Sequence, residues 1–217
     1  MSEKSEKPIH FAGVNLGRHR HVCAFFENQD QEDKVIIPFL KEGIDRGERV
    51  FCISATERRT HVLQKLQQAG TDVATAEKRG QLQIEQWVST VLGTESFDTE
   101  AMAARIESIL NEGRKQGFSR TRLVGRMEWV REYNMGISEL VRYENKLNSV
   151  LKNVDDPVIC SYDLSEFNAG ALVDVLRIHP ITILGDVVAK NPFFDTPEAV
   201  LEELSRRDNE VNGGMEG

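Results

Sequence analysis

Short apolar runs alternate along this chain with longer segments in which apolar residues recur every three or four positions. The short runs predict buried strands, and the longer segments predict helices that bury one face. Strands are expected over residues 21–27, 50–54, 81–87, 121–127, 157–163 and 181–184. Helices are expected over residues 30–46, 57–69, 72–79, 98–116, 138–151, 169–178 and 197–207. This alternation predicts a three-layer α/β/α fold, with one mostly parallel sheet between two layers of helices.

Glycines and capping residues mark the ends of these helices. Gly70, Gly80 and Gly117 each follow a helical segment, where glycine readily adopts the left-handed backbone that ends a helix. Asp98 precedes a helical segment and is expected to cap it, and Pro197 stands at the first position of the last helix.

The alternating pattern covers most of the chain, so we expect a single α/β domain over residues 19–208. With 217 residues the chain is long enough for one sizeable domain and short for two. Residues 1–18 are expected to form a flexible arm, and residues 209–217 are expected to form a disordered tail.

Composition and charge narrow the class of protein. Apolar residues make up 40% of the chain and charged residues 29%, as in soluble globular proteins. The net charge of -8 disfavours binding to nucleic acid or to anionic membranes. No apolar stretch reaches the ~20 residues of a membrane span, and the N-terminus lacks the apolar core of a signal peptide. We therefore expect a cytoplasmic protein that contacts neither nucleic acid nor membrane directly.

The turn after the first predicted strand lacks the residues that hold nucleotide phosphates. The strand, helix, strand order at the start resembles a RecA-like core, in which this turn carries glycines and a lysine that bind phosphates. Here residues 27–33 contain no glycine and four carboxylates, those of Glu27, Asp30, Glu32 and Asp33. We expect a RecA-like fold that has lost its phosphate loop. ATP is disfavoured, and no cofactor is expected.

A series of short motifs is similar to one known family. In chain order the motifs are His21-x-Cys23-x-Phe25-Phe26-Glu27, Pro38-Phe39-Leu40 with Gly43, Gly47-Glu48-Arg49, Phe97-Asp98, Gly125-x-Met127-x-Trp129, Tyr143-Glu144 with Leu147-Asn148, Tyr162-Asp163, His179-Pro180 and Asn191-Pro192-Phe193-Phe194. Their order and spacing over residues 20–195 resemble the MEDS domain, a DcmR-like sensory domain with a degenerate KaiC-like fold. The resemblance implies a domain that senses small hydrocarbon derivatives within a signalling pathway.

Two positions depart from the family pattern. Phe26 stands where the pattern has Tyr, and Arg126 stands where it has a carboxylate. Glu128 follows two positions later and lies on the same face if the strand continues. Either the acid has moved along the strand or the site has been altered.

Aromatic and acidic residues gather at the predicted carboxyl ends of the strands, where open α/β sheets bind ligands. We expect a pocket there for a small molecule that is partly apolar or cationic. The candidate ligand-binding residues are Phe26, Glu27, Arg126, Glu128, Trp129, Tyr143, Glu144, Asn148, Tyr162 and Asp163. Glu144 and Asn148 are one helical turn apart and share a face. For Glu27 and Asp163 the alternative is that each caps the next helix.

His21 and Cys23 share one face of a predicted strand and are the candidate metal ligands. A metal site needs three or four ligands with matched geometry, and the sequence does not place Cys160 or His179 beside them. The simpler interpretation is a buried histidine bonded to a carbonyl next to a core cysteine, so no metal is expected. Cys52 is likewise interpreted as a buried free thiol.

Phe193 and Phe194 follow a stiff turn at Asn191-Pro192. They are expected to fill the core. The alternatives are a lid over a pocket or a surface for a partner.

The sequence contains no nucleophile elbow, no zinc-protease motif and no dinucleotide-binding glycine motif, so no catalytic residue is assigned. The favoured hypothesis is a stand-alone sensory domain that binds a small organic ligand. It would pass the signal to a separate protein, such as a histidine kinase or a transcription regulator. One alternative is a nucleotide-binding switch or enzyme with Glu128 as general base and Arg126 on phosphate. The other is a pure interaction module, which includes the option of a homodimer.

Overall fold

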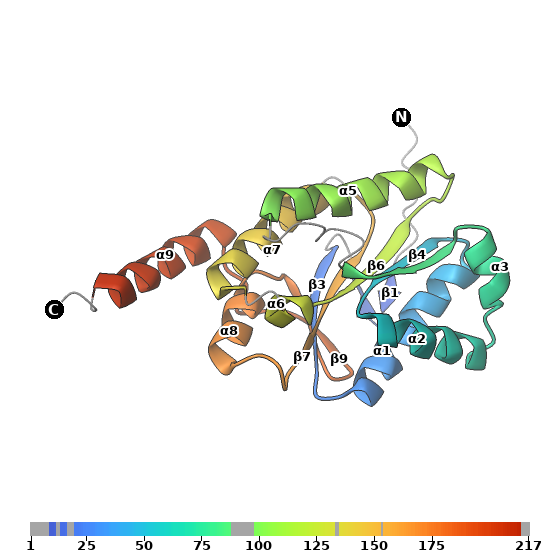
Figure 1. The fold of residues 1–217 in the computed structure, drawn as a ribbon, viewed down its shortest axis with the longest axis horizontal. Coiled ribbons are helices and arrows are strands. Elements are labelled where there is room, and N and C mark those ends of the chain that lie inside the picture. The colour runs from blue at the N-terminus through green and yellow to red at the C-terminus, as the bar shows by residue number, and fades with distance from the viewer. Residues whose placement is uncertain are drawn as a thin grey trace.

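Seven strands form one sheet in the order β5-β4-β6-β7-β3-β8-β9 (Figure 1). The strands are β3 (His21–Phe26), β4 (Arg49–Ile53), β5 (Leu82–Glu85), β6 (Thr121–Arg126), β7 (Val158–Asp163), β8 (Ile181–Leu184) and β9 (Val187–Lys190). All neighbouring pairs are parallel except β8 and β9. This computed structural model describes residues 9–11, 14–16, 20–87, 98–132, 135–152 and 154–213. The mostly parallel sheet expected from the sequence is confirmed.

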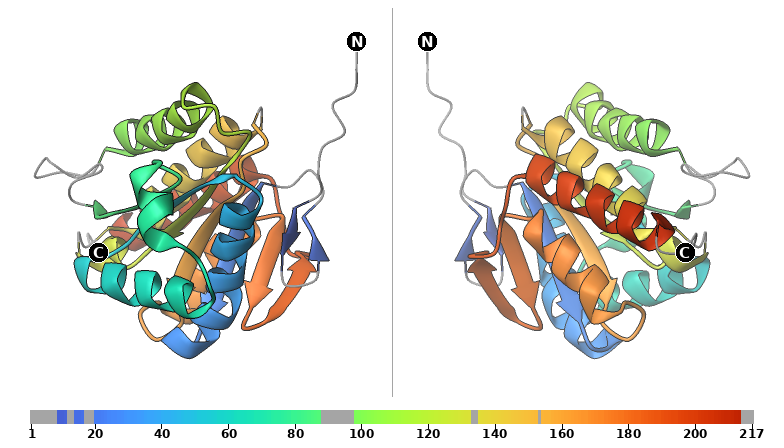
Figure 2. Two further views of the ribbon diagram at one scale, coloured as in Figure 1. Left: turned by 90° about the vertical axis from the view of Figure 1, so that its right-hand side faces the viewer. Right: turned by 90° about the vertical axis from the view of Figure 1, so that its left-hand side faces the viewer.

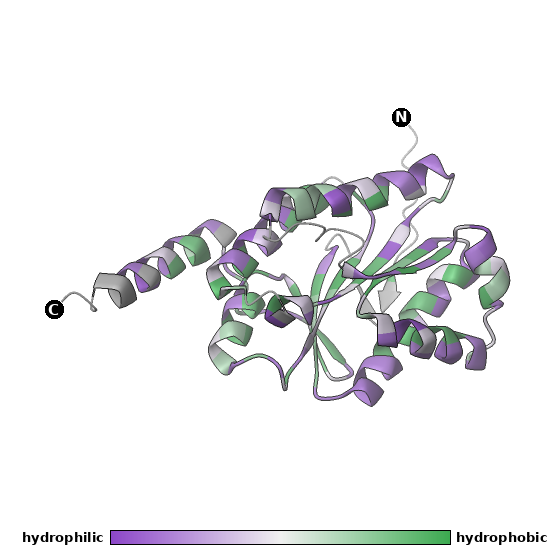
Figure 3. Ribbon diagram, viewed as in Figure 1, coloured by the Kyte–Doolittle hydropathy of each residue, from purple (hydrophilic) through white to green (hydrophobic). Residues whose placement is uncertain are grey.

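Helices cover both faces of this sheet, as Figure 2 shows from two sides. One face carries α1 (Gln29–Asp45), α2 (Thr56–Gln68) and α3 (Val73–Lys78). The other carries α5 (Thr99–Lys115), α6 (Trp129–Glu132), α7 (Ile137–Leu151) and α8 (Ala169–Arg177). Because side chains alternate along a strand, Val22 and Ala24 of β3 join the core beneath α1, whereas Cys23 and Phe25 join the core beneath α7. Figure 3 shows hydrophobic and hydrophilic residues alternating along the covering helices.

The last helix, α9 (Pro197–Gly213), packs beside α7 instead of on the sheet. Val200 and Leu204 of α9 form one apolar cluster with Val141 of α7 and with Ile178. The helix continues beyond the expected end at residue 207, because no proline or glycine interrupts it before Gly213. Residues 209–213 of the expected tail are therefore helical, and residues 214–217 lie outside the described residues.

Part of the expected N-terminal arm is paired with itself. Strand β1 (His10–Phe11) is antiparallel to β2 (Val14–Asn15). Ile9 and Leu16 flank this pair, and both side chains are buried in the core on the α1 face. Burial of these two apolar side chains holds the segment against the domain. The other residues before Arg20 lie outside the described part of the chain, as does Phe97.

Besides β1 and β2, the structure adds two short elements to those predicted from the sequence, β9 and α6. Strand β9 turns back along β8 after Gly185, and it is mostly exposed, so it lacks the apolar run that predicts a buried strand. Helix α6 is a single turn after β6. Gly70, Gly80 and Gly117 all have positive φ angles, as expected of residues that end helices. Within the described residues, none of the helices has the length and apolar character needed to cross a membrane.

Candidate functional site

The turn from β3 into α1 is closed by its own side chains. Asn28 caps α1, since its Oδ1 accepts the N–H of Gln31 at 3.0 Å. The N–H of Glu27 donates to Gln31 Oε1 at 3.0 Å. These N–H groups therefore bond to the chain itself, where a phosphate loop would direct N–H groups to a nucleotide. Glu27 is exposed and does not cap the helix.

Ion pairs and hydrogen bonds occupy the carboxyl edge of the sheet near α1. Arg126 Nε lies 3.0 Å from Glu32 Oε1, which also accepts a hydrogen bond from Ser161 Oγ at 2.9 Å. Glu128 Oε1 accepts the N–H of Ala55 at 2.7 Å. Burial raises the pKa of Glu128, although the charge of Arg126 and the Ala55 N–H act in the opposite direction. The cavity at this edge has a volume of about 30 Å³, which is room for little more than one water molecule.

Most of the predicted aromatic ligand residues lie in the core. Trp129, Tyr143 and Tyr162 are at most 1% exposed, and the rings of Trp129 and Tyr143 meet edge-on with centroids 5.7 Å apart. Phe26 is also buried, but on the opposite face of the sheet. Asp163 Oδ1 accepts the N–H of Ser165 at 2.9 Å in the turn after β7. The structure thus does not bring these residues together around one opening, and their contact with a ligand stays a prediction.

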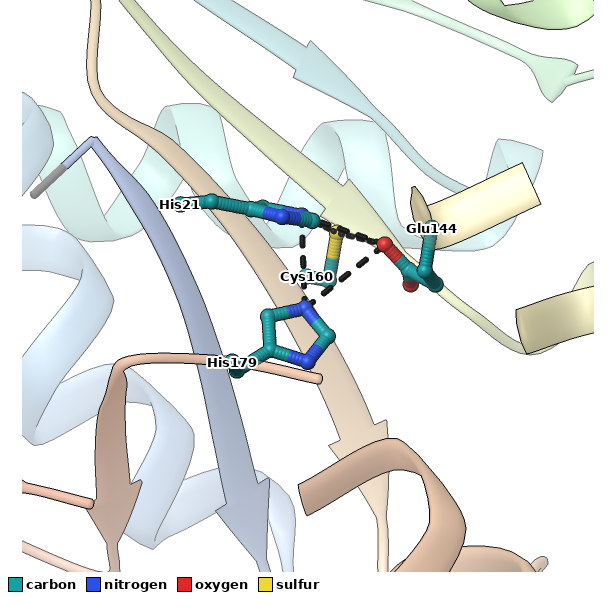
Figure 4. Close-up of side chains that lie close together, drawn as sticks. All are labelled: His21, Glu144, Cys160 and His179. Carbon is teal, nitrogen blue, oxygen red and sulfur yellow. Dashed lines mark hydrogen bonds and ion pairs between the residues drawn. The ribbon is translucent and has the colours of Figure 1, made fainter. Parts of the chain in front are cut away.

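Four polar side chains meet in the core beneath α7, toward the amino ends of the strands (Figure 4). His21 begins β3, Glu144 lies on α7, Cys160 lies in β7 and His179 immediately precedes Pro180 and β8. All four are at most 2% exposed, and their ligand atoms lie within 4.8 Å of one another. Glu144 Oε2 lies 3.1 Å from His21 Nε2, 3.6 Å from His179 Nε2 and 3.6 Å from Cys160 Sγ. His21 Nε2 lies 3.3 Å from both Cys160 Sγ and His179 Nε2.

Both histidines of this cluster are held through their Nδ1 atoms. His21 Nδ1 donates to Asn148 Oδ1 at 2.9 Å, and Asn148 Nδ2 donates to the carbonyl of Ile178 at 3.0 Å. His179 Nδ1 donates to the carbonyl of Val175 at 2.8 Å. An amide or carbonyl oxygen only accepts, so both Nδ1 atoms carry the hydrogen, and both Nε2 atoms face the centre of the cluster.

The charges of the cluster act on one another. Burial works to raise the pKa of Glu144, but the hydrogen bonds with His179 and His21 outweigh it and hold that pKa well below its usual range. Burial and the adjacent carboxylate raise the pKa of Cys160 well above its usual value. Burial lowers the pKa of His179, and the nearby His21 adds to this effect. Tyr162 donates its hydroxyl hydrogen to Glu144 Oε1. Imidazole, thiolate and carboxylate groups bind transition metals, so these four side chains could hold a metal ion.

Part of this cluster is predictable from the sequence. Glu144 and Asn148 are the expected ligand residues on one helix face, and His21 is a candidate metal ligand. Cys23, the other metal candidate, lies outside the cluster, and its Sγ donates to Thr182 Oγ1 at 3.6 Å. The sequence does not place Cys160 beside them, because it comes from a strand far along the chain. Strand alternation is the signal that could have found it, because Cys160 shares a face of β7 with the predicted Tyr162.

A hollow of about 390 Å³ opens beside the cluster, at the amino ends of β3 and β8. Its lining includes His21, Asn148, Leu151, Pro180, Phe194 and Glu198. Phe194 is 46% exposed and Phe193 is 66% exposed, so the expectation that they fill the core is wrong. Asn191 accounts for the difference: its Nδ2 donates to the carbonyls of Leu176 and His179 and fixes the turn with both rings directed outward.

Comparison with known proteins identifies the family. The sequence pattern of MEDS, the "MEthanogen/methylotroph, DcmR Sensory domain", matches residues 20–180. This chain belongs to the MEDS family. The transcriptional repressor DcmR of Methylorubrum extorquens (strain DSM 6343 / CIP 106787 / DM4) is 27% identical to it over 183 residues. The match covers 83% of this MEDS chain and 66% of the repressor, so the chain spans a little under two thirds of DcmR.

Two solved structures share the fold of this MEDS domain. A KaiC-like protein from Pyrococcus horikoshii OT3 gives a TM-score of 0.55 at 18% identity, covering 76% of this chain and 71% of that protein. An uncharacterised Pyrococcus horikoshii protein, crystallised in complex with an unknown peptide, gives a TM-score of 0.56 at 13% identity, covering 76% of this chain and 77% of that one. The first confirms the KaiC-like fold expected from the sequence. At these identities both comparisons concern the fold alone.

Proposed function

We propose that this MEDS domain binds a small organic molecule, of the hydrocarbon-derived class that the family resemblance implies, and passes the signal to a separate protein that regulates transcription. The description of the family as a sensory domain supports the sensing role. The similarity to the repressor DcmR supports an output in transcription.

The observation that carries this proposal is the hollow beside His21 and Asn148. Its volume of about 390 Å³ lies within the ~300–1,000 Å³ usual for small-molecule sites. Leu151, Pro180 and Phe194 offer apolar surface, while Asn145, Lys152 and Glu198 offer polar contacts. At the carboxyl edge of the sheet, the cavity beside Glu32 and Arg126 has room for little more than one water molecule. Two larger hollows at that edge, of about 330 Å³ beside Ala55 and about 220 Å³ beside Phe167, are lined by none of the predicted ligand residues, whereas Asn148 lines the hollow at the amino ends. We therefore place the ligand at the opposite end of the strands.

The position of the hollow suggests how binding would be transmitted. Asn148 and Leu151 lie on α7, whereas Phe194 and Glu198 lie just before and at the start of α9. A ligand that contacts both helices would favour one arrangement of α9 against α7. A signal requires such a difference in affinity between two arrangements.

Thermal unfolding with a panel of short-chain alcohols, amines and halocarbons tests this function. A compound that binds the folded domain raises its Tm. Phe194→Ala should reduce that rise, because the ring lines the hollow. Phe193→Ala is the matched control, since this neighbouring exposed ring does not line it. Equal Tm shifts in both variants would place the ligand elsewhere, and a rise with ATP and Mg²⁺ alone would favour the nucleotide-switch alternative.

A further inference from the structure

We propose that His21, Glu144, Cys160 and His179 bind one zinc ion in the core of this domain. The inference does not depend on the sensory role of the hollow. It is carried by the convergence of four ligand atoms on one buried point. These atoms are two imidazole nitrogens, one cysteine sulfur and one carboxylate oxygen. These are the ligand types that zinc prefers in proteins.

The spacing of the four atoms fits a tetrahedral ion. Zinc lies about 2.0–2.1 Å from nitrogen and about 2.3 Å from sulfur, so neighbouring ligand atoms in a tetrahedron are roughly 3.3–3.7 Å apart. Five of the six distances here range from 3.1 Å, between His21 Nε2 and Glu144 Oε2, to 3.6 Å. The sixth, between His179 Nε2 and Cys160 Sγ, is no longer than 4.8 Å. Small side-chain rotations are enough to close it around an ion.

Hydrogen bonds alone satisfy this centre poorly. Both Nδ1 atoms donate outward, so a neutral imidazole turns only a lone pair toward the centre, and it must take up a second proton at Nε2 before it can donate to Glu144. The two Nε2 atoms of His21 and His179 are 3.3 Å apart, with lone pairs facing each other. One added proton serves a single contact, whereas His21 Nε2 also lies close to Glu144 and Cys160. A cation at the centre accepts all four lone pairs at once.

The charges balance in the zinc-bound form. Zn²⁺ with one thiolate and one carboxylate is neutral, and a neutral centre is what a buried site accommodates without a large desolvation cost. Cys160 loses its proton on binding, as cysteine ligands of metals do.

The surroundings are also those of metal-bound histidines, which usually donate their second N–H to an oxygen. Asn148 and the Val175 carbonyl provide these acceptors, and Tyr162 holds the other oxygen of Glu144.

Metal analysis of the purified protein, incubated with an equal amount of zinc sulfate and then desalted, tests the proposal. We expect about one zinc per wild-type chain, the stoichiometry of a closed four-ligand site. Cys160→Ala should lose most of it. Cys52→Ala is the matched control and should keep it, because Cys52 is a buried cysteine on the opposite face of the sheet. Zinc missing from the wild type, or retained equally by both variants, overturns the proposal.

Cobalt(II) gives a second readout that does not depend on the folding of a variant. In the wild-type protein it should produce the intense visible bands of tetrahedral cobalt and a thiolate charge-transfer band in the near ultraviolet. Weak octahedral bands without charge transfer would exclude the site.

Asn148→Ala removes the acceptor for His21 Nδ1 and should weaken cobalt binding about 10–100-fold. Ser149→Ala, at an exposed position of the same helix, should leave it unchanged. Equal cobalt affinity in these two variants would count against ligation by His21.

Discussion

Arg126 Nε lies 3.0 Å from Glu32 Oε1, across the carboxyl edge of the sheet. Open α/β sheets bind their ligands at this edge, and here an internal ion pair occupies it. The side chains of Glu32 and Arg126 are 9% and 15% exposed, so each depends on its partner more than on water. Arg58 lies 3.6 Å from the same carboxylate, and Ser161 donates to it. The pair therefore fills the part of this edge that lies beside α1.

Removal of one partner of this pair should be costly. Glu32→Ala takes from Arg126 its nearest carboxylate and should lower the free energy of unfolding by about 3 kcal/mol. The double change Glu32→Leu with Arg126→Met should recover most of the loss, because two apolar side chains replace two desolvated charges. Urea denaturation measures both effects.

The exposed pair of Lys41 and Asp45 provides the control for that experiment. These side chains are 31% and 55% exposed, so Asp45→Ala should cost less than about 1 kcal/mol. If the variant with both Glu32→Leu and Arg126→Met is as unstable as Glu32→Ala, the loss of stability comes from other contacts of Glu32 and not from its ion pair with Arg126.

Local patterns in the sequence predict the layers of this fold because each strand and helix has its own periodicity. The strand expected over 21–27 is β3 (His21–Phe26), and the helix expected over 138–151 is α7 (Ile137–Leu151). The placement of Trp129 was harder to predict. Strand β6 ends at Arg126, and the single turn of α6 directs the indole into the core beside Tyr143, away from the edge.

The buried cluster depends on the order of strands in the sheet, which no local pattern records. His21 is 139 residues from Cys160 and 158 residues from His179. They meet because β7 and β8 flank β3. The sequence shows which side chains share a face of one strand, but only the strand order shows which strands lie side by side.

Gly43→Ala should destabilise the domain although alanine favours helices. A β-carbon at this position of α1 would lie 2.8 Å from Cδ of Arg122. That arginine is fully buried, and its Nε donates to Glu48 Oε2 at 2.6 Å, so it cannot move aside freely. Overpacking should outweigh the helix preference of about 1 kcal/mol and leave a net loss of about 1–2 kcal/mol.

Gly170→Ala in α8 is the matched change for Gly43→Ala. Its β-carbon would meet only Oδ1 of Asn168, at 3.3 Å, so we expect a change within about 0.5 kcal/mol. Thermal or urea unfolding compares the two variants. If they behave alike, Arg122 is more mobile than its contacts indicate.

The pH dependence of stability should reflect Glu128. Burial raises its pKa above the usual 4.5, so the folded protein binds this proton more tightly than the unfolded chain. The stability gained from the protonated form is present below the ordinary pKa and is lost as pH rises through the raised value. Glu128→Gln keeps an acceptor for the Ala55 N–H and removes this titration.

Relative to wild type, Glu128→Gln should therefore gain stability as the pH rises from about 4.5 toward neutrality. Urea denaturation at several pH values follows the difference. Glu107→Gln, on an exposed face of α5, is the control and should run parallel to wild type. A constant difference between Glu128→Gln and wild type at all pH values would show that the carboxyl is not perturbed.

The cysteines should be unreactive while the domain is folded. Burial raises the pKa of Cys23 and of Cys52 to about 12, so almost no thiolate is present at about pH 8. Iodoacetamide should leave both unmodified in the native protein and should modify all three cysteines, including Cys160, in urea. Mass spectrometry of the intact chain and of its peptides counts and locates the adducts.

Treatment with a chelator should not expose Cys52, because it lies on the face away from the cluster. Rapid labelling of Cys52 without urea would mean that the core beneath α1 opens during the experiment, since a closed core leaves that thiol neither ionised nor accessible.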